Sequence, residues 1–61
     1  MTKRESIIKV TDRIGNEWEI QKRELEGFSD DYSVHKNGSR VNIFNELYNA
    51  IKYMGEHMTT H

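Results

Sequence analysis

The sequence predicts an α+β domain in which an antiparallel sheet of three or four strands carries one C-terminal helix on one face. Three observations support this fold class. Apolar and polar residues alternate over the first two thirds of the chain, as in half-buried strands, and an Asn-Gly pair marks a tight hairpin. From Phe44 the apolar residues recur at helical spacing instead. The expected bounds are about 6–13, 17–25, 31–36 and 39–43 for the strands, 44–55 for the helix and 56–61 for a tail.

The 61 residues are expected to form a single domain, 1–61, near the lower size limit for unaided folding. Apolar residues make up 34% of the chain and charged residues 31%, so a small core with about 3–5 kcal/mol of net stability is expected. The absence of cysteine excludes a disulfide framework and thiol chemistry. No membrane span or signal peptide is apparent, so we expect a cytoplasmic protein, with a homodimer left open.

The first hairpin needs a loop that sets two apolar strand sides on one face. Ile8 and Val10 mark the apolar side of the first strand, and Trp18 and Ile20 mark that of the second. A two-residue loop at Gly15 would turn these sides to opposite faces, which a half-buried sheet does not tolerate. We therefore predict an odd loop of three or five residues that brings Val10 opposite Ile20, with a bulge at Gly15.

The second hairpin turns at Asn37-Gly38, because a type I′ turn needs positive φ at both central residues. A two-residue loop sets His35 opposite Arg40, and residues directly opposite one another share a face. The polar pair is then expected to face outward. The side chains expected to point into the core are Tyr32, Val34, Val41 and Ile43.

The C-terminal segment predicts an amphipathic helix with its apolar arc toward the sheet. We expect Asn42 or Asn45 to cap its start and Gly55 to end it. Tyr53 falls opposite Phe44 on the helix and is expected to stand in solvent. The arc consists of Phe44, Leu47, Tyr48, Ile51, Met54 and Met58, and the expected centre of the core is Trp18, Ile20, Tyr32, Val34, Val41, Leu47 and Ile51.

The sequence contains no pattern that predicts catalysis or a cofactor. Glu56, His57 and His61 are similar to a zinc-binding H-E-x-x-H segment, but the Glu-His order is reversed and a third ligand is not apparent. The chain has no cysteine nucleophile and no recognised Ser-His-Asp arrangement. We therefore expect neither an enzyme nor a metal protein.

Three features are candidates for binding a partner. The outer sheet face is polar and leans basic, the segment around Glu24 and Glu26 is acidic, and Tyr53 is an aromatic expected in solvent. The outer face is expected to display Lys9, Thr11, Arg13, Glu19, Gln21, Arg23, Ser33, His35 and Arg40. The candidate partner-binding residues are Lys9, Arg13, Glu19, Arg23, Asp30, Asp31, His35, Arg40 and Tyr53.

The segment from Trp18 to Met54, which ends in the helix "IFNELYNAIKYM", resembles the sheet-plus-helix DNA-binding domains at the N-termini of tyrosine recombinases. That resemblance implies a sheet inserted in a major groove. Such domains usually gather Lys and Arg, whereas this chain has a net charge of -1 and carries Glu19 on the face concerned. The contacts that the resemblance implies are Arg13, Arg23, His35 and Arg40.

The chain is also similar to small early proteins of bacteriophages and prophages, in its size, its lack of Cys and Pro, and its sheet-to-helix segment 34–53. That resemblance implies a protein that binds one host protein and inhibits or redirects it. We therefore expect a small, non-enzymatic interaction protein with a host protein as its partner. The alternative is a nucleic-acid-binding module that uses the exposed face of the sheet.

Overall fold

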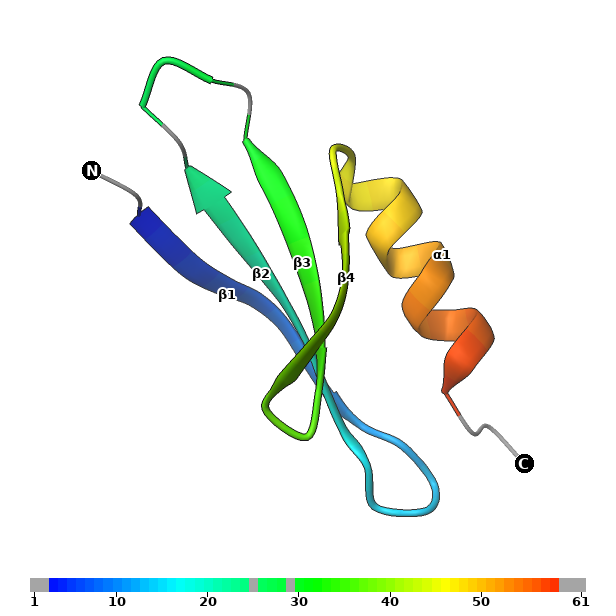
Figure 1. Ribbon diagram of the computed structural model, residues 1–61. Coiled ribbons are helices and arrows are strands. Elements are labelled where there is room, and N and C mark those ends of the chain that lie inside the picture. Colours follow the sequence, from blue (N-terminus) through cyan, green and yellow to red (C-terminus); the bar gives the residue numbers. More distant parts are fainter. Residues whose placement is uncertain (1–2, 25, 29, 59–61) are drawn as a thin grey trace.

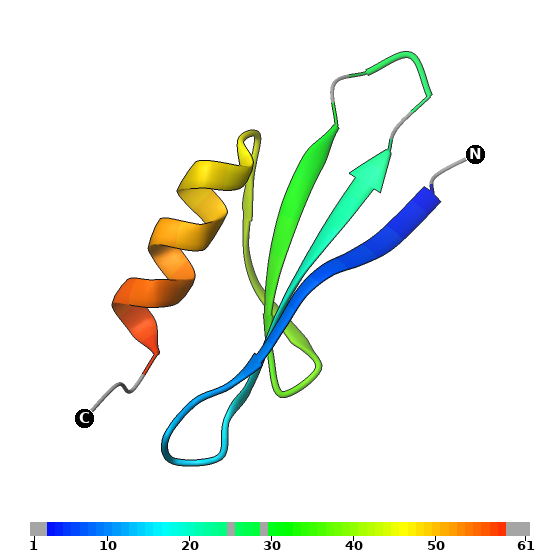
Figure 2. The same cartoon turned by 180° about the vertical axis from the view of Figure 1, so that it is seen from behind.

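The computed structural model describes residues 3–24, 26–28 and 30–58 and confirms the predicted fold class. Each strand pairs antiparallel with the next, so the sheet is a four-stranded meander in the order β1-β2-β3-β4 (Figure 1). The helix follows the last strand and packs on one face, where it contacts β2, β3 and β4. No described element covers the other face (Figure 2). The elements are β1 (Lys3–Thr11), β2 (Glu17–Glu24), β3 (Asp31–Lys36), β4 (Ser39–Phe44) and α1 (Leu47–His57).

The core lies between the sheet and α1 and is small. Ile20 and Val34 are fully buried and pair directly across β2 and β3. Ile8 and Val10 of β1 pack against the same cluster from one side. Because the apolar residues of neighbouring strands share this face, the helix can cover those of β2, β3 and β4 from one position. The buried apolar residues are Trp18, Ile20, Val34, Ala50 and Met54.

The loop between β1 and β2 has the predicted odd length. Thr11 pairs with Glu17, which leaves the five residues 12–16 between them. Val10 pairs with Trp18, and not with Ile20 as predicted, but the apolar sides still share one face. The bulge predicted in this hairpin lies elsewhere.

Gly15 adopts a φ of 92° inside the loop, where the chain reverses direction. The register instead shifts between Ser6 and Ile8, so Ile7 is the extra residue of the bulge. The bulge lies in the edge strand β1, which pairs only with β2, so its extra residue disturbs a single ladder.

A buried carboxylate organises this first loop. Asp12 is 7% exposed, and its Oδ1 accepts hydrogen bonds from the backbone N–H groups of Ile14 (3.1 Å) and Asn16 (2.9 Å). Its Oδ2 accepts a hydrogen bond of 2.9 Å from the indole Nε1–H of Trp18. One side chain thus satisfies two loop amides and the polar atom of a core tryptophan.

The second hairpin turns at Asn37-Gly38 as predicted. The φ angles of Asn37 and Gly38 are 51° and 86°, so both are positive, as a type I′ turn requires. The predicted pair His35 with Arg40 is present.

Beyond that pair a second bulge shifts the register, because Val34 pairs with Asn42 and leaves Val41 as the extra residue. The prediction that Val41 and Ile43 point into the core is therefore wrong. Val41 is 42% exposed, and Ile43 pairs with Ser33 on the face away from α1. The extra residue reverses the alternation of β4 beyond the bulge, so Phe44 takes the inward position.

The helix begins and ends later than predicted. β4 continues through Phe44, so α1 starts at Leu47, and the residue before it, Glu46, makes no side-chain cap hydrogen bond. The predicted cap by Asn42 or Asn45 is wrong; the Asn42 side chain instead accepts a bond from the N–H of Ile43.

The prediction that Gly55 ends the helix is also wrong. α1 continues through Gly55 to His57, and the N–H of Met58 donates to the carbonyl of Met54 at 2.9 Å. The helical hydrogen bonds thus continue past Gly55, and the φ angle of Gly55 is negative, as in the rest of the helix.

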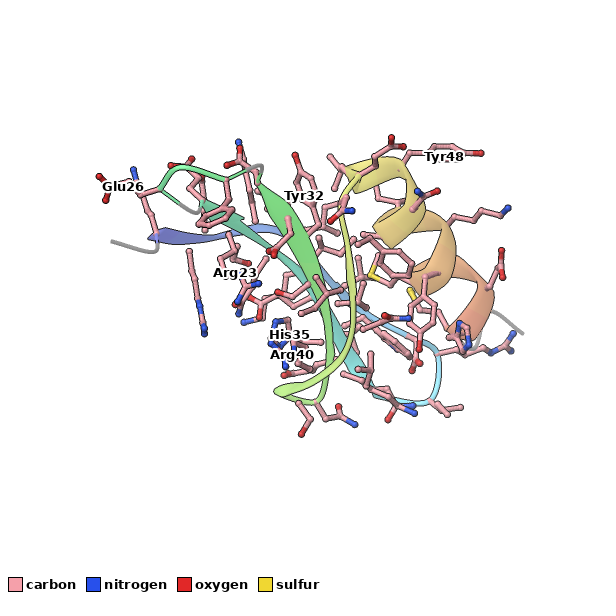
Figure 3. The ribbon with its side chains drawn as sticks, turned by 45° about the horizontal axis from the view of Figure 1, so that its top comes forward. Arg23, Glu26, Tyr32, His35, Arg40 and Tyr48 are labelled. Carbon is pink, nitrogen blue, oxygen red and sulfur yellow. The ribbon has the colours of Figure 1, made fainter. Side chains whose placement is uncertain are left out.

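The buried side of α1 is rotated from the predicted arc. Tyr48 is 72% exposed and Ile51 is 41% exposed, so neither belongs to the core. Figure 3 shows Tyr48 on the outer surface of α1. Ala50 is fully buried instead. The prediction that Tyr53 stands in solvent is wrong, because its ring is half-buried against Phe44, with 5.4 Å between the ring centroids. The extra residue in β4 places Phe44 inward. The ring of Phe44 then packs against Tyr53, so the side of α1 that carries Tyr53 faces the sheet.

Candidate functional site

The face of the sheet opposite α1, called the open face below, is polar along its length. The pairing places Lys9, Glu19 and His35 side by side across β1, β2 and β3. Arg4, Arg23 and Asp31 form a parallel row nearer one end. The residues that the register places on the open face are Arg4, Ser6, Lys9, Thr11, Glu17, Glu19, Gln21, Arg23, Asp31, Ser33, His35, Arg40 and Ile43.

A pocket of about 270 Å³ lies on the open face. Figure 3 shows Arg23, His35 and Arg40 gathered on the side of the sheet away from α1. All four strands contribute side chains to this pocket, so the lining residues are spread across the width of the sheet and are not confined to one strand. We call it the arginine pocket; its lining residues are Arg4, Arg23, Ser33, His35 and Arg40.

Arg23 is held in place by Asp31, its partner across β2 and β3. Its Nε and Nη2 donate to the two carboxylate oxygens at 3.0 and 2.5 Å, a two-point contact that fixes the guanidinium plane. Hydrogen bonding to this buried carboxylate raises the pKa of Arg23, so the guanidinium stays charged. The pair is close to neutral as a unit.

Arg4 and Arg40 are the uncompensated cations of the arginine pocket. Within residues 3–24, 26–28 and 30–58, neither makes an ion pair. They come from the two edge strands, β1 and β4, and so approach the pocket from opposite edges of the sheet. The pocket therefore carries an excess positive charge although the whole chain has a net charge of -1.

His35 lines the same pocket as these cations and is hydrogen-bonded to Ser33. The Ser33 hydroxyl lies within hydrogen-bond distance of Nε2 of His35, at 2.9 Å, and of the carbonyl of Gln21, at 3.3 Å. Burial lowers the pKa of His35, Glu19 opposes this effect, and Arg4 and Arg40 lower it further.

Glu19 is the anion nearest the middle of the open face. It accepts hydrogen bonds from the Ser6 hydroxyl at 2.7 Å and from the Gln21 amide at 2.8 Å. These bonds lower the pKa of Glu19, so it remains a carboxylate. With Lys9 as its neighbour on β1, it makes the open face mixed in charge beyond the arginine pocket.

The remaining predicted residues lie apart from the pocket. Arg13 is exposed in the loop between β1 and β2, and Asp30 lies 3.6 Å from Lys22 in a surface ion pair. Lys22 also lies 3.9 Å from Glu24, so the acidic segment is partly compensated by one lysine. Tyr53 borders a second pocket of about 260 Å³ on the helix side, with Phe44, Asn49, Lys52 and Glu56.

Sequence reasoning placed Arg23, Ser33, His35 and Arg40 on one face, and the arginine pocket brings these four together. It missed Arg4, because the first strand was expected to begin at residue 6. Regular alternation would also have set Arg4 and Ser6 on the side of Ile8 and Val10, and the bulge at Ile7 turns them to the open face instead.

The described residues offer no metal site and no membrane-spanning helix as a further candidate. In the described part of the chain, no group of three or more potential ligands could hold a metal ion, and His61 of the Glu-His pattern lies outside that part. Residues 3–24, 26–28 and 30–58 also include no helix with the length and hydropathy needed to cross a bilayer. No family model matches the chain, and no characterised protein and no solved structure matches it either.

The lowered pKa of His35 makes stability depend on pH in a defined direction. In the unfolded chain His35 takes up a proton near pH 6.5, and in the folded chain it does so only at lower pH. The contribution of His35 to stability is therefore complete above about pH 6.5 and is lost as the pH falls through its folded pKa. Urea midpoints between about pH 5 and pH 7.5 should rise less steeply in His35→Gln than in the wild type. Equal slopes would contradict the lowered pKa of His35 in the folded chain.

Proposed function

We propose that this chain is a small, non-enzymatic interaction protein that binds an acidic segment of a larger protein through the open face of its sheet. The observation that carries the proposal is the arginine pocket, in which Arg4 and Arg40 stand without ion-pair partners among the described residues. Arg23 is already oriented by Asp31 beside them. Guanidinium groups recognise carboxylates and related anions with two-point hydrogen bonds, and Arg is enriched at protein interfaces.

The size of the molecule fits a role in which it occupies the surface of its partner. A standard interface takes about 800 Å² from each partner, which would be close to a fifth of the 4429 Å² that this chain exposes. In keeping with the resemblance to phage early proteins, we propose a host protein as the partner, blocked or redirected by occupancy of its surface.

A polynucleotide is a poorer match for the open face. Duplex DNA binding depends on neutralising several phosphates along the backbone. Here Asp31 neutralises Arg23, and Glu17 and Glu19 lie farther along the same face of β2, beyond Gln21. The open face therefore suits one acidic group better than a continuous track of phosphates.

The proposal is tested by capture from a bacterial lysate with immobilised wild type and two matched double variants. Arg4→Glu with Arg40→Glu reverses the pocket charge, and Arg13→Glu with Lys52→Glu makes the same charge change at exposed sites elsewhere. We expect proteins that the wild type and the control retain and that the pocket variant loses, with all three chains equally folded by circular dichroism.

Equal retention by the pocket variant, or no protein retained by the wild type, would overturn the proposal. Duplex DNA is run in parallel at low salt on a mobility gel. A shift that the wild type and the control produce and the pocket variant does not would favour the nucleic-acid module instead.

A further inference from the structure

We infer that the arginine pocket binds a phosphate monoester dianion, carried as a phosphorylated side chain by the protein partner. This inference rests on the proposed function and specifies the chemical group that enters the pocket. It concerns the same residues, Arg4, Arg23, Ser33, His35 and Arg40.

The charge of the pocket matches a dianion. Arg4 and Arg40 each contribute one positive charge, and the ion pair of Arg23 with Asp31 contributes none, which gives an excess of two. His35 is neutral near pH 7 because its pKa is lowered. A phosphorylated side chain carries about -1.5 to -2 at that pH, whereas a carboxylate carries only about -1.

The arrangement of the donors also fits a tetrahedral oxyanion. The guanidinium groups come from β1, β2 and β4, so they approach a bound group from different directions. A phosphate monoester offers three terminal oxygens to such donors, whereas a planar carboxylate offers two. The volume of about 270 Å³ leaves room for the phosphate and for the side-chain atoms that carry it.

The rest of the open face favours an isolated phosphate over a chain of them. Glu19 lies beside His35 across β2 and β3 and is held as a carboxylate by Ser6 and Gln21. A second phosphate placed along the sheet toward Lys9 would meet this charge. A phosphorylated protein side chain presents one dianion and avoids that repulsion.

The test uses N-acetyl-O-phosphoserine methylamide as the probe in an NMR titration of the 15N-labelled chain near pH 7.5. The unphosphorylated competitor is the N-acetyl-aspartate methylamide. We expect shifts at residues 4, 23, 33, 35 and 40 and binding of the phospho-probe about tenfold tighter than binding of the aspartate analogue. Arg4→Gln and Arg40→Gln should each weaken it about tenfold or more, the loss expected for a hydrogen bond to a charged group, and Arg13→Gln should not.

A second readout places the anion beside His35 independently of affinity. Sulfate remains a dianion from about pH 5 to 8, so it does not titrate together with histidine. Bound in the pocket, it should raise the pKa of His35, which faces Arg4, Glu19 and Arg40 and is hydrogen-bonded to Ser33. The NMR signals of His57, which lies on α1, should not respond to sulfate at constant pH and serve as the internal control.

The outcomes separate this inference from the proposed function. Equal binding of the aspartate analogue, or no binding of the phospho-probe, overturns the phosphate inference, and lysate proteins lost from the charge-reversed variant would still support the function. Inorganic phosphate that binds as tightly as the phospho-probe shows a free-anion site, and a short duplex that binds more tightly shows a nucleic-acid site; both overturn it. Phospho-probe binding without any pocket-dependent capture overturns the proposed function instead.

Discussion

Replacement of Ile20 by alanine is expected to leave most of the molecules unfolded at 25 °C. The side chain is fully buried in the centre of β2, with Ile8 and Val34 as its cross-strand partners. Truncation removes buried methyl groups and leaves a cavity, which costs about 2–5 kcal/mol. A domain of this size has only about 3–5 kcal/mol of net stability. Urea unfolding followed by the fluorescence of Trp18, the single tryptophan, measures the loss.

Ile51→Ala is the matched control, because it removes the same atoms from a side chain that is 41% exposed. We expect it to cost less than about 1.5 kcal/mol, since part of that surface is in contact with water in the folded state. A larger loss from Ile51→Ala than from Ile20→Ala would contradict the placement of the core.

Replacement of Asp12 by alanine is expected to cost about 2–3 kcal/mol. The change removes the acceptor of three N–H groups, and the indole of Trp18 is buried, where water cannot replace the lost bond. The free energy of unfolding is measured in urea, and the exchange rate of the indole proton reports the lost bond directly. Unchanged stability together with a protected indole proton would contradict this role.

Asp12→Asn separates the two halves of that role. Asparagine keeps the shape but has one acceptor oxygen, so it can serve the loop amides or the indole of Trp18, not both. We expect a loss between zero and that of Asp12→Ala. Trp18→Phe combined with Asp12→Ala should lose less than the sum of the single changes, because the two side chains share a hydrogen bond.

The sequence was sufficient for the fold class because local signals and long-range requirements agree. The Asn37-Gly38 turn determines its own hairpin, and the two apolar sides of the first hairpin require an odd loop. The change to helical spacing after Phe44 marks the only helix of the described residues.

The positions of the two bulges could not be predicted from the sequence, and most of the errors in the predicted core follow from them. Val41 and Ile43 alternate as a regular strand would, so nothing local distinguishes an unbroken ladder from one with an extra residue. Whether β4 contains the extra residue depends on Phe44, because Phe44 packs on Tyr53 only if its side chain points inward. That contact joins a strand to a helix, and it also explains why Tyr53 is half-buried.

The site was predicted in part. Arg23, His35 and Arg40 follow from strand alternation, but the ion pair of Arg23 with Asp31 depends on the register between β2 and β3, which the connection between these two strands leaves open. The role of Asp12 had a signal, since Asp before a turn commonly accepts bonds from the following amides.

The central claim is that the open face, and not the helix side, meets the partner. The chain has no cysteine, so Lys9→Cys on the open face and Lys52→Cys on α1 each offer one thiol for a maleimide-linked polymer, with the same charge removed. Labelled chains are immobilised and tested for the proteins that wild type retains. The account predicts that the polymer at position 9 abolishes retention and that the polymer at position 52 does not. Retention that survives the label at position 9 and is lost with the label at position 52 would contradict it.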